Sequence, residues 1–563
     1  MDKQTLLFNI EKKLKLIYGK EYKESFLNDL KKLINNWEEE KFQEACSVSE
    51  KNIYLITYGD SIYEEGKPTL ETLNKFLKKE VKNAITDVHL LPMFTYTSDD
   101  GFSVVDYMEI DKTLGNWEDI KEFSKDYRLM FDFVANHISK SSSWFKGYIN
   151  DEEKYKQFFI KEDKNFDTSK VVRPRTSPLF HKYKSKPKEK TAWTTFSEDQ
   201  VDINFKHFPV FIEMTNILLK YAQNGATSIR LDAIGFLWKE SGTPCIHLPQ
   251  THSIIEIWRL LLDYFKVNTQ IITETNVPHK ENISYLGNGI NEAHMVYQFA
   301  LPPLALYTLT THNSLKLTNW AKTIDKISDN ATFFNFLSSH DGIGMRPTEG
   351  ILTDEDRELL VNKTLENGGR VSYKNNVDGT KSVYELNINY NDALINKGED
   401  DNLKTEVDKI LASQGILLSC IGVPAIYYHS LLGSKNYYKG VEESGINRRI
   451  NREKLQYEKI CEDLHSDERR SLIFNGLKNL IELRKNESAF SPYANQRVID
   501  LGEKIFALER TNHKTKEKIT FILNVDSKPI EVDTRLDGID IITNQKVCGK
   551  INLEAYKFLW IKF

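Results

Sequence analysis

The segment Ser228-Ile-Arg-Leu-Asp-Ala233 decides the fold. It is largely apolar on both faces, as in a parallel strand covered by helices, yet Arg230 and Asp232 interrupt it near its end. Because these residues are two positions apart, their side chains point the same way on a strand. Taken alone, such a pair is most often a structural ion pair. Burying charge is costly, however, so charged residues at the ends of several apolar strands indicate a site.

Seven further apolar runs alternate with longer segments of helical periodicity, such as Leu70–Lys82, Phe211–Gln223 and Ile254–Phe265. This alternation predicts an α/β fold, a (β/α)8 TIM barrel. A doubly wound open sheet is the alternative, which the lack of a glycine-rich phosphate fingerprint after the first run disfavours. The eight expected strands are Ile53–Thr57, Val88–Pro92, Leu129–Val134, Thr227–Ala233, Gln270–Asn276, His294–Phe299, Thr332–Leu337 and Ile421–Tyr428.

Other segments indicate additional parts around the barrel. Apolar residues at helical spacing predict an N-terminal helical extension over residues 1–50, with a structural role. The barrel is expected over residues 51–487, with inserted subdomains at 138–200 and 343–400, because these gaps are too long for simple connections. Both gaps follow a strand and therefore rise from the face where barrel active sites lie. Residues 488–563 predict an antiparallel β domain with strands at Val498–Leu501, Ile505–Arg510, Ile519–Asn524, Ile530–Val532, Ile539–Ile542 and Phe558–Phe563.

Composition excludes several functional classes. The 563 residues carry a formal net charge of −5 without a long basic block, which gives no electrostatic reason to bind nucleic acid. No run of 18 apolar residues predicts a membrane span, and the first residues lack the form of a signal peptide. Neither a metal nor a cofactor is expected. The cysteines have no metal-ligand spacing and are expected to be free thiols in the cytoplasm; they are Cys46, Cys245, Cys420, Cys461 and Cys548.

Polar residues end four of the expected strands on one face of the barrel. They are Asp132, Asn136, His137, Arg230, Asp232, Glu274, His340 and Asp341. We expect Arg230 to keep Asp232 ionised, as a nucleophile must be. A carboxylate-rich pocket would raise the pKa of Glu274, which then protonates a leaving oxygen. Two carboxyls about 5–5.5 Å apart predict retention, whereas about 6.5–9.5 Å predicts inversion. Asp341 is placed to stabilise a positively charged transition state.

At these residues the sequence resembles the α-amylase superfamily. The four short motifs of that superfamily occur in order, as Asp132-Phe-Val-Ala-Asn-His137, Ser228-Ile-Arg-Leu-Asp-Ala233, Ile272-Thr-Glu-Thr275 and Phe336-Leu-Ser-Ser-His-Asp341. The resemblance implies that Asp232 is the nucleophile, Glu274 the acid/base and Asp341 the transition-state stabiliser. It also implies that donor glucose is held by His137, Arg230 and His340.

Within the superfamily the chain is most similar to the sucrose phosphorylase group. The similar stretches include Leu55-Ile-Thr-Tyr-Gly-Asp60, Asp99-Asp-Gly-Phe102, Arg173-Pro-Arg175, His340-Asp-Gly-Ile-Gly344 and Arg448-Arg-Ile-Asn-Arg452. They imply Asp99, Phe102 and Arg448 as further glucose contacts. Three departures resemble the glucosylglycerate phosphorylases of this group: the helical extension, Asn276 two residues after Glu274, and Gly242–Leu248 followed by His252.

The resemblance implies a retaining α-glucoside phosphorylase, a hexosyltransferase. It would convert 2-O-α-glucosylglycerate and phosphate to α-glucose 1-phosphate and glycerate through a covalent glucosyl-Asp232 intermediate. Asn276 would lie near the acceptor or phosphate, Arg175 and His247 are candidates for an anionic acceptor, and Arg175 and Tyr384 for phosphate. The partners expected are the glucoside and phosphate, without nucleic acid or membrane, and a homodimer is left open.

Three alternatives differ in acceptor or class. One is a sucrose phosphorylase or another α-glucoside phosphorylase, such as a glucosylglycerol phosphorylase. The second is an α-glucosidase or transglucosidase with the same three carboxylates. The third is a non-catalytic amylase-like protein, which the presence of all three carboxylates disfavours.

Overall fold

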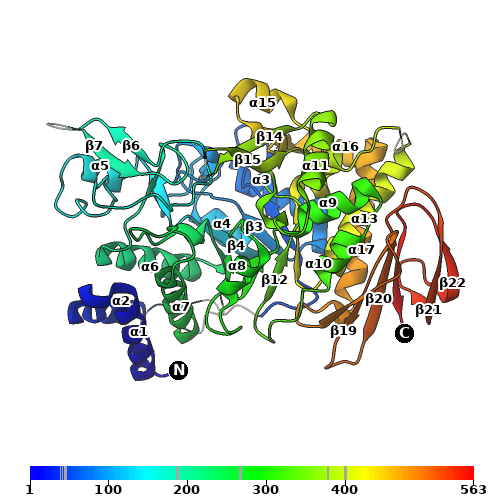
Figure 1. The fold of residues 1–563 in the computed structure, drawn as a ribbon, viewed down its shortest axis with the longest axis horizontal. Coiled ribbons are helices and arrows are strands. Elements are labelled where there is room, and N and C mark those ends of the chain that lie inside the picture. Colours follow the sequence, from blue (N-terminus) through cyan, green and yellow to red (C-terminus); the bar gives the residue numbers. More distant parts are fainter. Residues whose placement is uncertain are drawn as a thin grey trace.

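The computed structural model describes residues 1–38, 40, 42, 47–185, 189–265, 269–376, 379–398 and 402–563. Its centre is a closed barrel of parallel strands (Figure 1). The sheet closes because Tyr54 of the first strand pairs with Asp87 on one side and with Ala425 on the other. The predicted TIM barrel is therefore confirmed, and the open sheet is excluded. The barrel strands are β1 (Tyr54–Thr57), β3 (Asp87–Leu90), β4 (Arg128–Phe133), β9 (Ala226–Leu231), β10 (Gln270–Thr273), β11 (Met295–Tyr297), β12 (Thr332–Asn335) and β16 (Val423–Tyr427).

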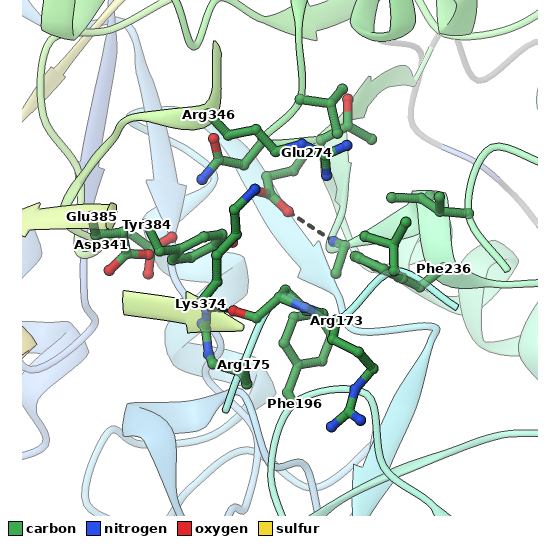
Figure 2. A pocket seen from close by; sticks show the side chains of 18 of the residues that line it. Arg173, Arg175, Phe196, Phe236, Glu274, Asp341, Arg346, Lys374, Tyr384 and Glu385 are labelled. Carbon is green, nitrogen blue, oxygen red and sulfur yellow. Dashed lines mark hydrogen bonds between the residues drawn. The ribbon is translucent and has the colours of Figure 1, made fainter. Parts of the chain in front are cut away.

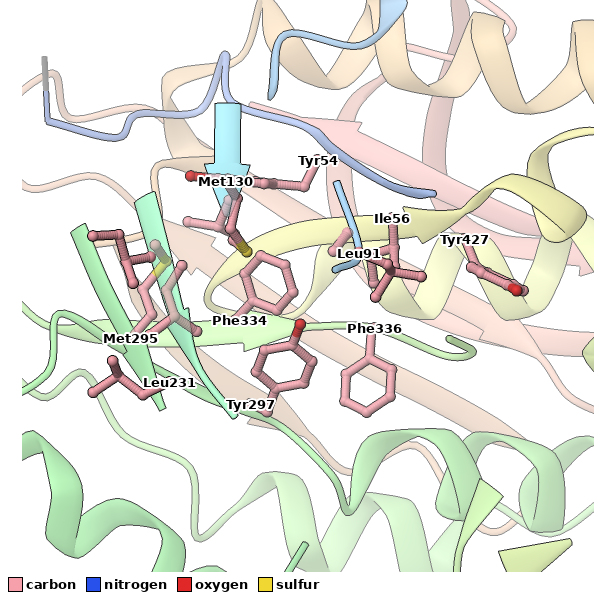
Figure 3. Packing of buried hydrophobic residues seen from close by; sticks show 14 of the residues in the cluster. Tyr54, Ile56, Leu91, Met130, Leu231, Met295, Tyr297, Phe334, Phe336 and Tyr427 are labelled. Atoms are coloured by element: carbon pink, nitrogen blue, oxygen red, sulfur yellow. The ribbon is translucent and has the colours of Figure 1, made fainter. Parts of the chain in front are cut away.

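Large apolar side chains fill the barrel interior (Figure 3). The ring of Phe334 meets Tyr54 edge-on at 5.2 Å and Tyr297 at 4.7 Å, measured between centroids. Met130 is fully buried, and Tyr54 Oη lies 2.7 Å from Ser228 Oγ, so the buried hydroxyls have partners. Each fully buried side chain of this size contributes about 1.5–3 kcal/mol. The packed interior leaves only the ends of the barrel for a site.

Helices follow the strands and cover the barrel outside (Figure 1). The expected helix Leu70–Lys82 is α3 (Thr69–Phe76), which continues as a π-helical turn over Leu77–Val81. Pro249 begins α7 at its first position, where its fixed φ suits a helix and no N–H is needed. The other covering helices are α4 (Trp117–Phe123), α6 (Phe208–Gln223), α7 (Pro249–Tyr264), α8 (His279–Ile283), α9 (Leu301–Thr311), α10 (Leu315–Ala321), α13 (Leu403–Ser419), α14 (Tyr428–Leu431), α15 (Tyr438–Ser444), α16 (Tyr457–Ser466) and α17 (Glu468–Lys485).

Two long connections stand at the carboxyl ends of the barrel strands. The connection from β4 to α6 contains β5 (His137–Ser139), α5 (Ser143–Ile149), β6 (Phe180–Tyr183), β7 (Lys190–Trp193) and β8 (Gln200–Asp202). The connection from β12 to α13 contains β13 (Ile343–Gly344), α11 (Asp354–Glu366), β14 (Arg370–Asn375), β15 (Lys381–Asn387) and α12 (Tyr390–Ala393). The order β13-β15-β14 makes the second connection a small antiparallel sheet. In Figure 1 both connections lie along the upper side.

The N-terminal segment forms α1 (Lys3–Tyr18) and α2 (Glu24–Glu38), which pack on α6 and α7. Leu14 is fully buried on the inner face of α1. Phe26 stacks on Phe208 with ring centroids 4.1 Å apart, and Tyr18 Oη donates to the Phe205 carbonyl at 3.1 Å. The extension thus shares a core with the barrel helices.

The chain ends in a six-stranded antiparallel sheet, ordered β18-β19-β20-β23-β21-β22. One strand prediction was wrong. The structure has one long strand, β21, where two separate strands were expected at Ile530–Val532 and Ile539–Ile542. The strand β22 was not predicted. A register shift between Asp533 and Asp537 and the mostly polar, exposed face of β22 break the apolar pattern. The strands are β18 (Asn495–Ile499), β19 (Ile505–Thr511), β20 (Lys518–Asn524), β21 (Ile530–Asp540), β22 (Gln545–Leu553) and β23 (Phe558–Lys562).

Two sequence expectations concern the whole chain. In the parts of the chain that the structure describes, no helix is both long and apolar enough to cross a membrane. Cys245, Cys420, Cys461 and Cys548 are free thiols, whereas Cys46 lies outside the described residues.

Candidate active site

A cavity of about 390 Å³ lies at the carboxyl ends of the barrel strands, between the two long connections (Figure 2). A volume of this size suits a small-molecule ligand. Arg230 lies beneath the cavity, and His247 lies outside its lining. The other predicted site residues line it together: Asp99, Phe102, His137, Arg175, Asp232, Glu274, Asn276, His340, Asp341, Tyr384 and Arg448.

Arg230 joins the carboxylates under the cavity floor. Its side chain is 2% exposed, and Nη1 lies 2.7 Å from Asp232 Oδ1 and also contacts Asp132 on β4. The second oxygen of Asp132 lies 2.6 Å from His89 Nε2 on β3. The guanidinium is therefore compensated on two sides, as a buried charge must be.

Glu274 follows β10 and is held by the turn that follows Asp232. Its Oε2 accepts a hydrogen bond from the Ala233 N–H at 2.9 Å, drawn as a dashed line in Figure 2. Ala233 has a left-handed φ of 46°, which costs an alanine about 1–2 kcal/mol. Backbone strain of this kind is concentrated at functional sites, where the surrounding structure holds it. Here the strained residue donates to Glu274.

Burial raises the pKa of Asp232 well above its usual range, Arg230 opposes this shift, and Glu274 adds to it. Burial likewise raises the pKa of Glu274, again against Arg230. The expectation that Arg230 keeps Asp232 ionised named the group that lowers this pKa but left out burial, which raises it. Arg230 lies 2.7 Å from Asp232 but 3.8 Å from Glu274, so its charge favours ionised Asp232 with the proton on Glu274.

Asp341, in the loop after β12, lies between two arginines. Arg448 Nη1 is 2.7 Å and Arg452 Nη2 is 3.7 Å from Asp341 Oδ1. Burial acts to raise the pKa of Asp341, but these guanidiniums outweigh it, and the pKa is lowered. Asp341 is thus ionised at neutral pH and can stabilise positive charge. Arg448 is held from its other side by Glu385 of β15, whose Oε2 accepts from Nε at 3.0 Å.

Phe102 and the two predicted histidines form one wall. The Phe102 ring stacks on His340 with centroids 4.6 Å apart and planes 6° apart. Its carbonyl oxygen lies 3.0 Å from His137 Nε2 and accepts from Gln200 at 3.1 Å. Burial lowers the pKa of His137 to about 4 and that of His340 well below its usual value. Both imidazoles are therefore neutral, and offer hydrogen bonds rather than charge.

The segment Asp99-Asp-Gly-Phe102 is bent by three residues with positive φ, at 51°, 49° and 111°. A Cβ at Gly101 would lie 2.7 Å from the Pro92 carbonyl oxygen, so only glycine fits there. Arg452 Nη1 lies 2.7 Å and Arg449 Nη2 lies 2.6 Å from the Asp100 carboxylate. These anchors leave Asp99 on the cavity side.

The opposite wall comes from the long connections. The Arg175 guanidinium lies over Tyr384, 4.9 Å from the ring centroid, and 5.6 Å from that of Phe196. Asn276 lines the cavity, and its Oδ1 is buried and has no hydrogen-bond partner among the described residues.

His247 contacts the cavity only indirectly. Its Nδ1 lies 2.6 Å from Tyr285 Oη and its Nε2 lies 3.4 Å from Glu281. Glu281 in turn lies 3.6 Å from Arg346, which lines the cavity. The expected direct contact of His247 with an acceptor is therefore not seen in this arrangement.

Sequence reasoning missed several residues that line the cavity. Arg346 lies two residues beyond His340-Asp-Gly-Ile-Gly344, so inspection of that stretch's neighbours was the available signal. Lys374 lies in an inserted hairpin without a motif, and no sequence signal marks it. The others are Arg173, Phe196, Gln200, Glu349 and Glu385.

Known proteins match the fold and the site together. The Alpha amylase, catalytic domain family matches residues 77–354. A glucosylglycerate phosphorylase of Spirochaeta thermophila is 43% identical over 520 residues, covering 91% of this chain and 88% of that protein. The chain belongs to the α-amylase superfamily, in its phosphorylase group. Superfamily membership confirms the resemblance seen in the four motifs.

More distant members of the group show the same fold. A sucrose phosphorylase of Streptococcus mutans is 30% identical over 475 residues, covering 81% of this chain and 92% of that protein. The crystal structure of sucrose 6F-phosphate phosphorylase from Thermoanaerobacter thermosaccharolyticum superposes with a TM-score of 0.75 at 23% identity, covering 90% of this chain and 99% of that chain. Glucosylglycerate phosphorylase is thus the more similar of the two phosphorylases compared by sequence.

Proposed function

We propose that the protein is a retaining α-glucoside phosphorylase that converts 2-O-α-glucosylglycerate and phosphate to α-glucose 1-phosphate and glycerate. The observation that carries this proposal is one cavity that combines the acidic floor of Asp232 and Glu274 with cationic walls at Arg175, Arg346 and Lys374. A purely acidic floor repels both the glycerate carboxylate and phosphate. The cations offset that repulsion. Similarity to glucosylglycerate phosphorylases supports glycerate over fructose.

The first half-reaction transfers glucose to the enzyme. Glu274 gives its proton to the glycosidic oxygen while Asp232 attacks the anomeric carbon. The bond to the glycerate oxygen breaks, glycerate leaves with the proton, and a β-glucosyl ester of Asp232 forms. Asp341, ionised between its arginines, stabilises the oxocarbenium-like charge that develops on the sugar.

The second half-reaction replaces Asp232 with phosphate. A phosphate oxygen attacks the anomeric carbon, the ester bond to Asp232 breaks, and Glu274 takes the proton of a monoanionic phosphate. Each displacement inverts the anomeric centre, so the product is α-glucose 1-phosphate with net retention. Each of these steps uses the chain's own residues and phosphate as co-substrate.

A donor panel tests the proposal. The purified protein is incubated with phosphate and either glucosylglycerate, sucrose or glucosylglycerol, and glucose 1-phosphate is measured. We expect the highest kcat/KM with glucosylglycerate. Highest turnover with sucrose would instead make it a sucrose phosphorylase, the alternative that the Streptococcus mutans relative supports. Glucose release without phosphate would place it among the hydrolases.

The nucleophile has its own test. Asp232→Asn should abolish glucosyl transfer from every donor, because the amide cannot form the ester. Circular dichroism and the melting temperature serve as controls for the fold. Substantial turnover by this variant would contradict the assignment.

We also propose that the enzyme acts in the cytoplasm without a cofactor. We further propose that it forms a homodimer. The four described free thiols fit a reducing compartment. Light scattering of the purified protein measures the oligomeric state, and a monomer at all concentrations would contradict the dimer.

A further inference from the structure

Two cations from the second long connection reach the catalytic cavity without belonging to any of the motifs. Arg346 lies in the short turn Arg346–Thr348 after β13, and Lys374 lies on β14. Both side chains line the cavity, and Figure 2 shows them extending into it in the region of Glu274.

Neither cation is closely paired with a carboxylate. Lys374 Nζ is 3.6 Å from Glu349, and Arg346 Nη2 is 3.6 Å from Glu281. The side chains of Arg346 and Lys374 are only 17% and 18% exposed, whereas those of Glu281 and Glu349 are 44% and 46% exposed. Both carboxylates are thus more exposed to solvent than the cations they contact, although Glu349 also lines the cavity.

Bringing these like charges together has a cost in the empty cavity. Burial lowers the pKa of Lys374, Glu349 opposes that shift, and the nearby charge of Arg346 lowers the pKa further. An anion between the two cations relieves both effects, because it compensates each charge at short range. Two partly buried like charges in one cavity therefore favour an anion between them.

The reaction supplies two anions at the same place. In a retaining double displacement, the acceptor leaves from one face of the sugar and the second nucleophile attacks on that same face, opposite the enzymic nucleophile. Glycerate and phosphate therefore occupy the same side of the glucosyl-Asp232 ester in turn. One cationic subsite is enough for both.

We propose that Arg346 and Lys374 form a single anion subsite, which binds the glycerate carboxylate in the first half-reaction and phosphate in the second. The proposal rests on the proposed phosphorylase function and adds the residues that select a charged acceptor. Arg175, whose guanidinium is stacked over Tyr384 and Phe196, is a third cation of the same cavity and is left unchanged in the test. Glycerol, which has the same carbon chain without a carboxylate, gains nothing from the subsite.

The test loads the enzyme with a donor that carries neither carboxylate nor phosphate. With α-glucosyl fluoride, the carbon–fluorine bond breaks, fluoride leaves and the Asp232 ester forms. The ester is then partitioned among glycerate, glycerol, phosphate and water. The variants are Arg346→Gln and Lys374→Gln, and the matched control is Lys381→Gln on the neighbouring strand, an exposed residue outside the cavity lining.

We expect kcat/KM for glycerate and for phosphate to fall roughly tenfold to hundredfold in each variant, as for the loss of a hydrogen bond to a charged group. Fluoride release in water and transfer to glycerol should fall much less than transfer to glycerate, and circular dichroism and the melting temperature serve as controls for the fold. Phosphate should inhibit transfer to glycerate competitively. The Lys381→Gln protein should match the wild type throughout.

Two results would overturn the subsite. One is a variant that keeps the wild-type preference for glycerate over glycerol and the wild-type KM for phosphate. The other is non-competitive inhibition of glycerate transfer by phosphate, which requires separate sites. If the wild-type enzyme uses phosphate but prefers glycerol to glycerate, the proposed substrate is wrong. The effect of the variants on the KM for phosphate then tests the subsite independently of that substrate.

Discussion

Replacing Glu274 with Gln separates the proton that this residue supplies from everything else it does. The glutamine side chain has nearly the same shape as glutamate. Its amide oxygen can still accept a hydrogen bond from the Ala233 N–H, which lies 2.9 Å from Glu274 Oε2 in the wild type. Arg230 lies 3.8 Å from Oε2 and makes its short contact with Asp232, so the nucleophile keeps its partner. The variant therefore loses one acidic proton and one negative charge.

The size of the effect follows from the leaving group. Glycerate departs as an alkoxide unless it is protonated, so glucosylglycerate should react about 10²–10⁴-fold more slowly, the usual contribution of a general acid. That range is about 3–5 kcal/mol in activation free energy. Fluoride leaves without a proton. Phosphate dianion attacks without a base. Transfer from α-glucosyl fluoride to phosphate should therefore fall less than about tenfold.

The pH profile gives a second reading of the same variant. In the wild type the rate with glucosylglycerate falls as pH rises past the pKa of Glu274, which burial raises above its usual value. With α-glucosyl fluoride this basic limb should be absent in both wild type and variant, because fluoride leaves without a proton. Glu274 still carries its proton over the range in which Asp232 titrates, so the acid limb of kcat/KM, which is set by Asp232, should keep its wild-type position in the variant.

The assay measures initial rates of fluoride and glucose 1-phosphate release between about pH 4 and 9, a range that spans the ordinary titration of a carboxyl group and its raised values. Wild type and variant are compared with both donors. Equal losses with glucosylglycerate and α-glucosyl fluoride would refute the acid role. An acid limb that moves clearly in either direction would contradict the assignment of the shared proton to Glu274.

Three further outcomes are expected. Asp341→Asn should lower kcat about 10²–10³-fold, as for a lost electrostatic stabiliser; an unchanged kcat would assign Asp341 to binding alone. Leu14→Ala should lower the free energy of unfolding by about 3–5 kcal/mol because it opens a cavity under α1; urea denaturation measures it, with Phe8→Ala, 69% exposed, as the control. Dialysis against EDTA should leave glucose 1-phosphate release unchanged, and a loss restored by a metal ion would show a cofactor.

The barrel could be predicted from the sequence because its strands are buried on both faces and are therefore apolar throughout. Each of the eight expected apolar runs overlaps a barrel strand. Arg230 lies near the end of β9 and Asp232 directly follows the strand, and their side chains meet at 2.7 Å. The C-terminal sheet was harder to predict from the sequence. In β22 most side chains are exposed and polar, so the strand pairs through its backbone and leaves little trace in the apolar pattern.

The site divides in the same way. Residues in strand-end motifs, such as Asp232 and Glu274, could be assigned because the barrel carries every strand end to one face. Arg346 and Lys374 could not, because their place in the cavity depends on how β14 and β15 pair and on where the connection folds back. The raised pKa of Asp232 also depends on burial, which a sequence does not display.

The pairing of β14 with β15 brings Lys374 and Tyr384 to the cavity on a hairpin that lies apart from every barrel strand. Inherited changes in this hairpin that spare Glu385, the partner of Arg448 beside Asp341, are therefore expected to alter which molecule exchanges glucose with the enzyme while Asp232 and Glu274 keep their places. Related enzymes with the same catalytic carboxylates can therefore come to use different acceptors through changes in a few dozen residues. The same separation gives protein engineers a short, self-contained segment to randomise when they seek new acceptors.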